Sequence, residues 1–596
     1  MSLLVDLFGY LGIVLHGLTI TAQSLAVGGV LFLVAVARPF AATAAGSASA
    51  GAVAVGAALD ASTLDPVGRD ATPARSRGAG ADRPAGSPTL PPGLAIRRAA
   101  ARIAAWSALA LVLCDGLNLA MQSAVLMDTL GITLPDALGA DYAVAGLVKI
   151  AAAGTVSVLL FLPRRTPAAI LLALCAAELA AATMTTHAAA RLSGSAVLLG
   201  VEFLHQLGAA VWIGAIPCFV MALNRVDDLA GWRWIGPRFS RVSLAGVGCI
   251  LVSGITMGVF YIGSPSGLYG TAYGVMVCAK VAMFLMLLGL GFANSRVTAR
   301  LARGDRSAAV PRMKRFAEVE IGIGITIFFT AASLTSVPPA IDLAQDRVTF
   351  HEIVERNTPH WPVLRSPDHD RLAIPALQQT LDAEAAEHAA RPLPAFVEGG
   401  GELPPRNADD ILWSEYNHHW SGLFVLAIGL LALLNQAGVR WARHWPLVFL
   451  GLGGFLLVRS DPEVWPIGAI GWFDAFRDVE VVQHRLFVVV IVVFALFEWA
   501  VRTDRLRSHR AALVFPLMCA TGSALLFTHS HAIANVKDQL LIELTHTPIA
   551  LGGIVAGWSR WLQLRLPPGR TTRFAGWVWP TCFVLTGVAL LLYREA

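Results

Sequence analysis

Nine histidines of the chain lie in, or just beyond, the half of an apolar stretch that faces one side of a membrane. They are His16, His187, His205, His418, His419, His484, His529, His531 and His546. Ionisable side chains at membrane depth cost free energy and are usually functional, and neutral imidazole is a common metal ligand. Their gathering toward one face predicts that the protein holds a metal ion there.

The densest group of these histidines comes from four apolar stretches in the last third of the chain. The motifs are WSEYNHHW (413–420), VVQHR (481–485), THSHAIAN (528–535) and ELTH (543–546). They supply the candidate ligands His418, His419, His484, His529, His531 and His546, with Glu415, Gln483, Asn535 and Glu543 as groups that orient imidazoles. A metal site usually needs three or four ligands. His418 and His419 lie about 100° apart around a helix, so we expect only one of them to face inward.

A second, sparser group lies in the first half of the chain. Met184 and His187 are three residues apart, as are Glu202 and His205, so each pair shares a helix face. The further candidates are His16 in the first apolar stretch, and Asp115 and Met121 in the outer half of the second. Imidazole with thioether suits copper, above all Cu(I), whereas imidazole with carboxylate also suits other divalent ions. We therefore expect copper, and no ligand series marks a path through the inner half of the membrane.

Two alternatives to a copper site remain open at this point. Two histidines from facing helices can bind haem b axially, and the pairs His484 with His546 or His187 with His205 would serve. A haem-containing oxidoreductase or a metal reductase is therefore the class alternative, although candidates near one face argue against electron transfer across the membrane. The other alternative is a purely structural polar network. No phosphate-binding glycine motif is present, so ATP-driven transport is not expected, and metal handling is favoured over catalysis.

The composition places the chain in a membrane. Of its 596 residues, 56% are hydrophobic and only 14% are charged, against roughly 25% charged in soluble proteins. Apolar stretches long enough to span a bilayer predict an all-α, polytopic protein of about fourteen helices. The stretches are 7–36, 98–127, 142–163, 167–188, 195–223, 238–263, 272–298, 313–337, 412–437, 444–458, 478–501, 509–530, 538–562 and 573–594.

Arginine is distributed unevenly between the connections. It concentrates in alternate ones, which are 37–97, 164–166, 224–237, 299–315, 438–443, 502–510 and 560–573. The positive-inside rule places these in the cytoplasm and both termini outside. The net charge of +5 reflects these inner loops and implies no nucleic-acid partner. The first apolar stretch is too long for the core of a signal peptide, so we expect no cleavage there.

Two polar segments divide the chain. Residues 41–95, rich in Ala, Gly, Ser and Pro, are predicted to be a disordered cytoplasmic loop. Residues 338–411 are predicted to be an outer linker, which separates an eight-helix domain (1–337) from a six-helix domain (412–596). Lys149 and Lys280 lie inside apolar stretches, and we expect them either to pair with an acid such as Glu178 or Glu202 or to extend their amines toward the membrane surface.

Residues of about 140–340 resemble the CopD-type copper resistance and transport membrane domain. The matching stretches are TMTTHAAA (183–190), LHQLGAAVWIGAI (204–216), RFSRVSLAGVGCILVSGI (238–255), TAYGVMVCAK (271–280) and LTSVPP (334–339). The resemblance implies a bacterial inner-membrane protein that handles copper delivered from the periplasm, often alongside a soluble periplasmic copper carrier. It also implies His187 and His205 as the matching polar positions. The 41–95 insertion departs from the pattern, and the last 185 residues resemble an extension of longer CopD-like proteins.

Overall fold

The structure is a computed structural model that describes most of the chain. The described residues are 2–43, 91–163, 165–191, 194–226, 228–304, 310–368, 372, 408–468, 470–477, 479–528 and 536–595. Within them the secondary structure is helical, and β structure is limited to one isolated bridge between Val464 and Ile470. The prediction of an all-α membrane protein is confirmed.

The helices of the first part run from α1 to α13. They are α1 (Ser2–Phe32) with the π-helical turn η1 (Leu33–Ala37), α3 (Pro92–Leu130), α4 (Leu134–Gly139), α5 (Asp141–Phe161), α6 (Ala168–Thr183), α7 (His187–Ala190), α8 (Ser195–Ala209) with the π-helical turn η2 (Ala210–Gly214), α9 (Ile216–Leu223), α10 (Leu229–Ile262), α11 (Pro265–Tyr269), α12 (Ala272–Ala302) and α13 (Val310–Leu334).

The linker and the last part of the chain contribute the remaining elements. They are η3 (Ala340–Leu343), α14 (Phe350–Arg356), α16 (Ala408–Gln436), η5 (Trp441–Leu447), α17 (Val448–Arg459), η6 (Asp474–Arg477), α18 (Val479–Arg502), η7 (Ala511–Leu513), α19 (Val514–Leu526), α20 (Val536–Arg565) and α21 (Arg570–Leu591).

Every predicted apolar stretch contains a helix of the structure. Among the described residues, 12 helices are long and apolar enough to cross a membrane, including Trp441–Arg459, which covers the short stretch 444–458. Ala168–Thr183 and Ala511–Leu526 are apolar but shorter. The protein is therefore a multi-pass membrane protein, and the total of fourteen spans stays a prediction because these two helices fall below the usual spanning length.

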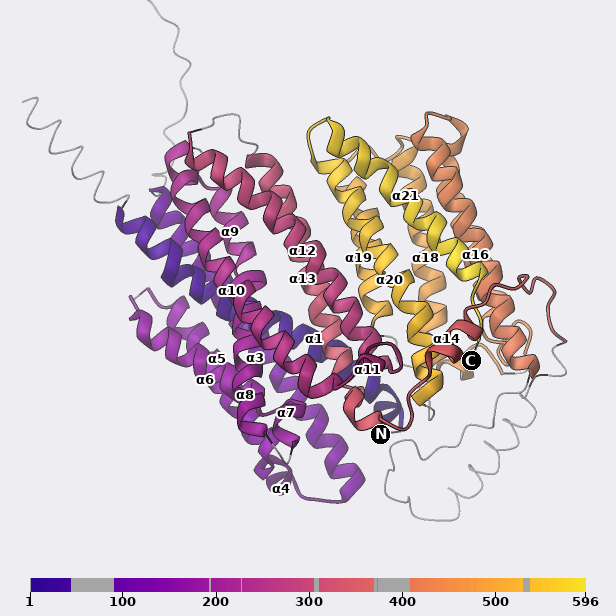
Figure 1. Ribbon diagram of the computed structural model, residues 1–596, viewed down its shortest axis with the longest axis horizontal. Helices are drawn as coiled ribbons and strands as arrows, with labels where there is room; N and C mark the ends of the chain where they lie inside the picture. The colour runs from indigo at the N-terminus through magenta and orange to yellow at the C-terminus, as the bar shows by residue number, and fades with distance from the viewer. Residues whose placement is uncertain are drawn as a thin grey trace, which may run out of the picture.

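The helices from the two parts of the chain lie side by side (Figure 1). They meet where α12 and α13 pack against α19 and α20. A Cβ atom on Gly322 would lie 1.6 Å from the Trp558 ring, so glycine is needed for this close approach. The Glu318 carboxylate also binds Trp561 Nε1 at 2.9 Å and Arg565 Nη2 at 3.0 Å. The division into domains at the linker stays a prediction.

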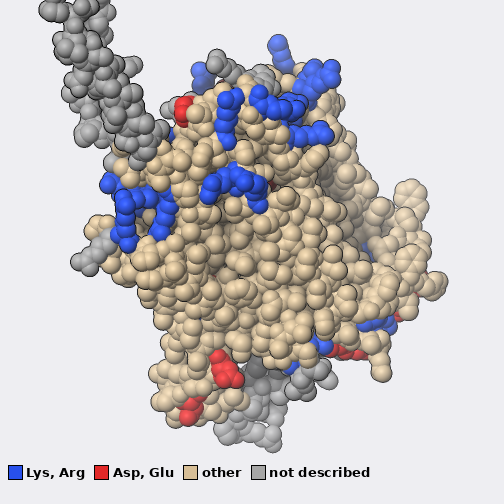
Figure 2. All heavy atoms as spheres, turned by 60° about the vertical axis from the view of Figure 1, so that its left-hand side comes forward, with Lys and Arg blue, Asp and Glu red and all other residues tan. Residues whose placement is uncertain are grey.

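Charge is distributed unevenly along the helix direction. Figure 2 shows Lys and Arg side chains gathered at one end of the molecule and Asp and Glu near the other. We call the first the basic end, which includes Arg225, Arg300, Arg303, Arg505 and Arg570 in or beside interhelical connections. The other, the opposite end, carries α4, α7, α11 and α14 (Figure 1). This agrees with the predicted alternation of connections, and the side that faces the cytoplasm stays a prediction.

The start of the linker ties the two groups of helices together at the opposite end. Arg347 donates hydrogen bonds to Ser264 Oγ at 2.6 Å and Ser266 Oγ at 2.9 Å. In α14, Glu352 pairs with Lys537 of α20 at 3.2 Å. Hydrogen bonds from the Thr349 backbone N–H and hydroxyl, and then Lys537, lower the pKa of Glu352 to about 2. The carboxylate therefore stays ionised, and the pair is lost only in strong acid.

A close helix crossing joins α1 to η2 in the first part of the chain. A Cβ atom on Gly28 would lie 2.3 Å from the Ala210 carbonyl oxygen, and one on Gly214 would lie 1.9 Å from the Ser24 carbonyl oxygen. Small residues let helix backbones approach closely in membranes. These two glycines therefore set the distance between α1 and the π-helical turn that carries Trp212.

We predict that Gly28→Ala destabilises the protein by about 1–3 kcal/mol, because the new methyl group meets backbone atoms that cannot rotate away. The matched control is Gly248→Ala on α10, where a Cβ atom would have no other atom within 4 Å. This control should leave stability unchanged or raise it by up to about 1 kcal/mol. Thermal unfolding of the purified proteins in detergent measures both, and equal midpoints for the two variants would contradict the prediction.

Candidate functional site

The structure brings His418 of α16 and His546 of α20 together at the opposite end. Their ring centroids lie 6.1 Å apart, and the rings are nearly perpendicular. Tyr593, in the segment after α21, stacks on His418 at 3.8 Å and lies 6.2 Å from the His546 ring. We call His418, His546, Tyr593, Ser414 and Glu595 the paired-histidine cluster.

Each imidazole of this pair is held by the backbone of its own helix. His418 Nδ1 lies 2.9 Å from the Ser414 carbonyl oxygen, and His546 Nδ1 lies 2.9 Å from the Ile542 carbonyl oxygen. A carbonyl oxygen only accepts hydrogen bonds, so in the neutral ring Nδ1 carries the proton and Nε2 carries the lone pair. Metal-ligating histidines use this arrangement, in which one ring nitrogen donates to the protein and the other faces the metal.

The Glu595 carboxylate closes one side of the cluster. It is buried and accepts hydrogen bonds from the Ser414 hydroxyl and, at 2.7 Å, from the Tyr593 hydroxyl. The Glu595 backbone N–H donates to Glu415 Oε1 at 3.3 Å. Glu415, a predicted orienting group, therefore anchors the segment after α21 to α16. The result is a buried carboxylate close to two imidazoles.

His419 faces different neighbours from its sequence neighbour His418. The Val363 backbone N–H donates to His419 Nδ1 at 2.8 Å, so the Nε2–H donates to the Tyr593 carbonyl oxygen at 2.9 Å. The side chain is fully buried. Both ring nitrogens are thus used in joining the linker, α16 and the segment after α21, and this conformation leaves no lone pair of His419 for a metal.

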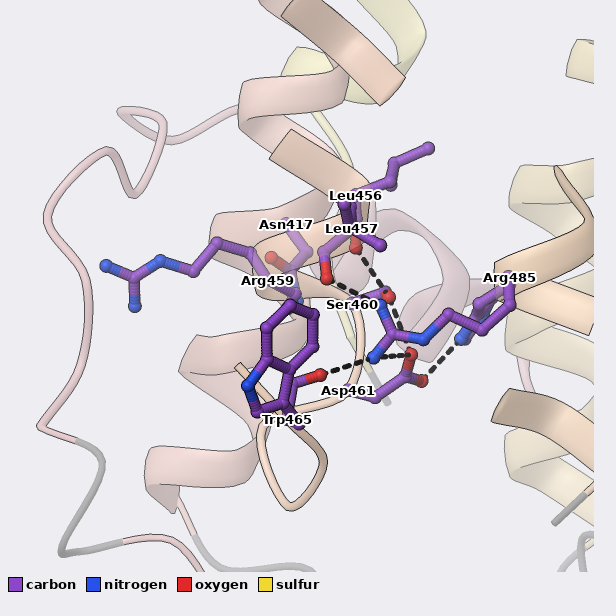
Figure 3. A network of polar contacts seen from close by, with 9 residues as sticks. Asn417, Leu456, Leu457, Arg459, Ser460, Asp461, Trp465 and Arg485 are labelled. Atoms are coloured by element: carbon purple, nitrogen blue, oxygen red, sulfur yellow. Dashed lines mark hydrogen bonds and ion pairs between the residues drawn. The ribbon is translucent and has the colours of Figure 1, made fainter. Parts of the chain in front are cut away.

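His484 of α18 is oriented by a carboxylate that follows α17. His484 Nδ1 lies 2.6 Å from Asp461 Oδ1, and Asp461 is 5% exposed. Figure 3 shows Asp461 among Ser460, Trp465 and Arg485, with Ser460 Oγ donating to it at 2.8 Å. Arg485 Nη2 lies 3.9 Å from Asp461 Oδ2 and donates to the Trp465 carbonyl oxygen at 2.8 Å. A carboxylate bound to Nδ1 directs Nε2 of the imidazole away from the acid.

The remaining predicted residues of the dense group are His529, His531, Asn535, Gln483 and Glu543, and the structure describes the side chain of Glu543 alone among them. His529, His531 and Asn535 lie outside the described residues, as does the side chain of Gln483. Glu543 is buried and accepts a hydrogen bond from Thr547 on its own helix at 3.3 Å.

In the first part of the chain, His205 of α8 lies within a polar group at the centre of the helices. His205 Nδ1 lies 3.0 Å from Ser253 Oγ on α10. The next residue, Gln206, donates through Nε2 to Oε1 of Glu202, one turn earlier, at 3.3 Å, and Gln23 Nε2 of α1 donates to Gln206 Oε1 at 2.8 Å. Glu202, predicted to support a metal site, is thus part of a hydrogen-bonded row that joins α8 to α1.

The other candidates of the first part occupy separate places. His187 begins α7, and its buried Nε2 has no hydrogen-bond partner among the described residues. Met184 follows α6 and is half exposed. His16 is partly buried on α1. Met121 of α3 packs toward the same helix, since a Cβ atom on Gly12 would lie 3.9 Å from Met121 Cε.

Lys149 pairs with an acid, as predicted, but with one that the sequence interpretation did not name as its partner. Its Nζ binds Asp115 Oδ1 at 2.6 Å, and both side chains are buried, whereas Glu178 or Glu202 had been expected. The reason is that α3 and α5 are packed neighbours and present these two residues at the same height. The pairing also engages Asp115, a predicted auxiliary ligand, with a lysine. Both carboxyl oxygens of Glu178 are buried and have no hydrogen-bond partner in the described part of the chain.

Across the described residues, no group of three or more His, Cys, Asp or Glu side chains is arranged to hold a metal ion. The structure therefore assembles a two-imidazole pair and an oriented third imidazole, but no complete ligand set. The sequence interpretation missed Asp461, Tyr593 and Glu595, which surround these imidazoles. An acid after the end of α17 was a visible signal for Asp461. Nothing local indicated that the segment after α21 folds back onto α16.

Comparison with known proteins assigns one region of the chain. Residues 235–334, which include most of α10 and all of α12 and α13, match the model of the family described as CopD, Copper resistance protein D. No solved structure matches the chain.

Curated relatives extend this match. Copper transport protein CutJ of Bacillus subtilis (strain 168) is 30% identical over 217 residues, which are 34% of this chain and 38% of that protein. Copper resistance protein D of Pseudomonas syringae pv. tomato is 26% identical over 152 residues, which are 24% of this chain and 49% of that protein. The matches span less than half the length of either relative. They confirm the resemblance: residues 235–334 of this multi-pass membrane protein are similar to the CopD family.

Proposed function

We propose that the protein binds copper at the end opposite the basic end and handles it for uptake, tolerance or delivery to copper enzymes. The observation that carries this proposal is the pair His418 and His546, whose Nδ1 atoms both donate to backbone carbonyls. Imidazole nitrogen suits copper among the transition metals. The CopD-type region and relatives named for copper transport and copper resistance support the same cargo.

In this proposal, His418 and His546 are the first two ligands through Nε2. The His484 imidazole, oriented by Asp461, and the sequence-predicted His529 and His531 are the source of the remaining ligands. Glu595 places a negative charge near the imidazoles, which favours a bound cation. We leave His419 out of the set because its ring nitrogens join backbone groups.

The first part of the chain supplies a second copper location. We centre it on His205 with Glu202 as an auxiliary group, and we propose His187, Met184 and His16 as separate candidate ligands. His187 supports this role because its buried Nε2 is without a hydrogen-bond partner in the described residues. Copper would reach the protein from the periplasmic side of a bacterial inner membrane, handed over by a soluble carrier. The arginine distribution and the positive-inside rule support this orientation.

The proposed domains follow from the same assignment. The CopD-type domain is 1–337, the periplasmic linker is 338–411, and the histidine-rich domain is 412–596. Of the alternatives, no observation favours a haem b enzyme. An absorption spectrum of the purified protein separates the two, since haem gives a Soret band and a copper-handling protein without haem does not.

We predict that His418→Ala combined with His546→Ala lowers copper affinity by on the order of 100-fold or more, because removal of groups that merely orient ligands already costs 10–100-fold. Binding is measured by titration of the full-length protein with a competing copper chelator. The matched control is His509→Ala, an exposed histidine at the basic end, which should bind copper like the wild type. Equal affinities for the double variant and the wild type would contradict the proposal.

We also predict that Asp461→Asn lowers copper affinity by roughly 10–100-fold, because the amide no longer fixes the charge and orientation of the His484 ring. In a His484→Ala background the same change should have no further effect on copper binding. Asp342→Asn is the control, since Asp342 binds Arg191 at 3.3 Å in an exposed pair at the same end. A loss of affinity from Asp461→Asn that persists without His484 would show a merely structural effect.

A further inference from the structure

One buried carboxyl group is used by none of the contacts described so far. Glu320 lies on α13, about 15 Å along the helix from Val310 and therefore near the middle of the span. It is 4% exposed. Asn294 Nδ2 of α12 donates to Glu320 Oε1 at 2.7 Å, and the Trp212 side chain of η2 donates to the same carboxyl group. The notable feature is that both partners are neutral.

The positively charged side chains near Glu320 interact with other groups. We consider the helices that pack against α13, in the half that is nearer the basic end and without the last turn of each helix. Their titratable or charged side chains are Arg38, Cys218, Arg296, Cys519 and Arg560. Arg38 donates to the Thr166 carbonyl oxygen, Arg296 lies over the Phe292 ring, and Arg560 donates to Gln563. On α13 itself, Glu318 forms ion pairs with Arg315 of the same helix and with Arg565 of α20. In the described part of the chain, Glu320 thus has no ion-pair partner.

An ionised carboxylate without a cationic partner is expensive at membrane depth. The neutral acid is therefore the resting form of Glu320, and the ionised form needs a compensating positive charge close by. This distinguishes Glu320 from Asp115, whose charge is balanced by Lys149 at 2.6 Å. A group that is neutral by default and ionises only when a cation arrives is chemically suited to carry a proton.

The partner of Glu320 fits both of its protonation states. An asparagine amide donates through Nδ2 to a carboxylate, and after rotation by 180° its Oδ1 accepts from the protonated acid. Asn294 Oδ1 is buried and has no hydrogen-bond partner in the structure as described. A lysine or arginine at this position would stabilise only the ionised acid. Asn294 is thus a neutral partner that can follow a change in protonation.

Polar side chains extend from Glu320 in both directions. On the side of the opposite end, the chain leads from Trp212 back six residues to Gln206. Gln206 belongs to the hydrogen-bonded row of Glu202, Gln206 and Gln23. Toward the basic end, Thr298 Oγ1 donates to the Asn294 carbonyl oxygen at 3.1 Å. The first part of the chain therefore has polar groups along most of its height, with Glu320 between the two ends.

We propose that Glu320 is a proton-binding site through which the protein couples copper movement to proton movement in the opposite direction. This inference rests on the proposed function, which identifies copper as the ion that is moved. The acid releases one H⁺ and becomes a carboxylate as one Cu⁺ ion enters the span, and it takes one H⁺ back when the Cu⁺ ion leaves. No electron is transferred, and the charge in the span is unchanged at each exchange.

The first test asks whether Glu320 carries a proton at rest. Infrared spectra of the full-length protein are compared for the wild type and Glu320→Gln. At neutral pH we expect the difference to contain the carbonyl stretch of a protonated carboxylic acid, lost only in alkaline buffer. Glu320→Gln preserves the acceptor and the neutral charge, so its thermal stability should match that of the wild type. A difference spectrum with carboxylate bands at neutral pH would overturn the proposal.

The second test measures coupling in proteoliposomes that contain the full-length protein and a trapped pH-sensitive dye. A copper gradient should drive a pH change in the wild type that falls at least about tenfold, or 1.4 kcal/mol on a free-energy scale, in Glu320→Gln. Glu320→Asp should retain part of it. Glu318→Gln, which removes a carboxylate two residues earlier on α13, is the matched control and should behave like the wild type.

The outcomes separate this inference from the proposed function. Equal copper-driven pH changes in the wild type and Glu320→Gln overturn the proton site, as does a dependence of the signal on sodium instead of pH. A wild type that binds copper but moves no proton also overturns it, and leaves the copper function standing. A wild type that binds no copper removes the proposed function and the coupling, while the infrared result still decides the protonation of Glu320.

Discussion

The absence of water inside a bilayer is the constraint on which this structure depends. Every polar group at membrane depth must find its partner within the protein, because an unpaired one costs several kcal/mol. Lys149 and Asp115 show the usual solution, a buried ion pair between neighbouring helices at 2.6 Å. Glu320 shows a different one, in which neutral donors hold a carboxyl group. The two solutions have different consequences, since a paired charge is fixed and a neutral acid can exchange its proton.

The same constraint explains how the imidazoles near the opposite end are presented. His418 and His546 each donate Nδ1–H to a carbonyl oxygen one turn earlier on their own helices, so each ring is fixed before any ligand arrives. His484 is fixed by the carboxylate of Asp461 instead. His419, next to His418, uses both ring nitrogens in hydrogen bonds to the backbone of the linker and of the segment after α21. Adjacent histidines with the same chemistry thus have different roles because they face different neighbours.

Close packing places these groups at their working positions. Gly28 and Gly214 allow α1 to approach the π-helical turn η2, which carries Trp212 toward Glu320. Gly322 allows Trp558 of α20 to lie against α13, so the histidine-rich helices are packed directly on the CopD-type region. Glu318 ties the same two helices near the basic end, and Glu352 with Lys537 ties the parts at the opposite end. The two parts of the chain are therefore held together both near the basic end and at the opposite end.

Much of the fold could be predicted from the sequence, because hydrophobic length and arginine distribution are properties of single segments. The helices and their all-α class follow from them, whereas the CopD resemblance rests on motifs such as TMTTHAAA (183–190) and LHQLGAAVWIGAI (204–216). Which helices touch is a property of the packed molecule. Tertiary structure alone decided that Lys149 pairs with Asp115, that His418 lies beside His546, and that Tyr593 stacks on His418 from a segment far away in the chain. It also decided that Glu320 has neutral partners, because a residue's charge environment is set by the helices packed around it and not by its neighbours in sequence.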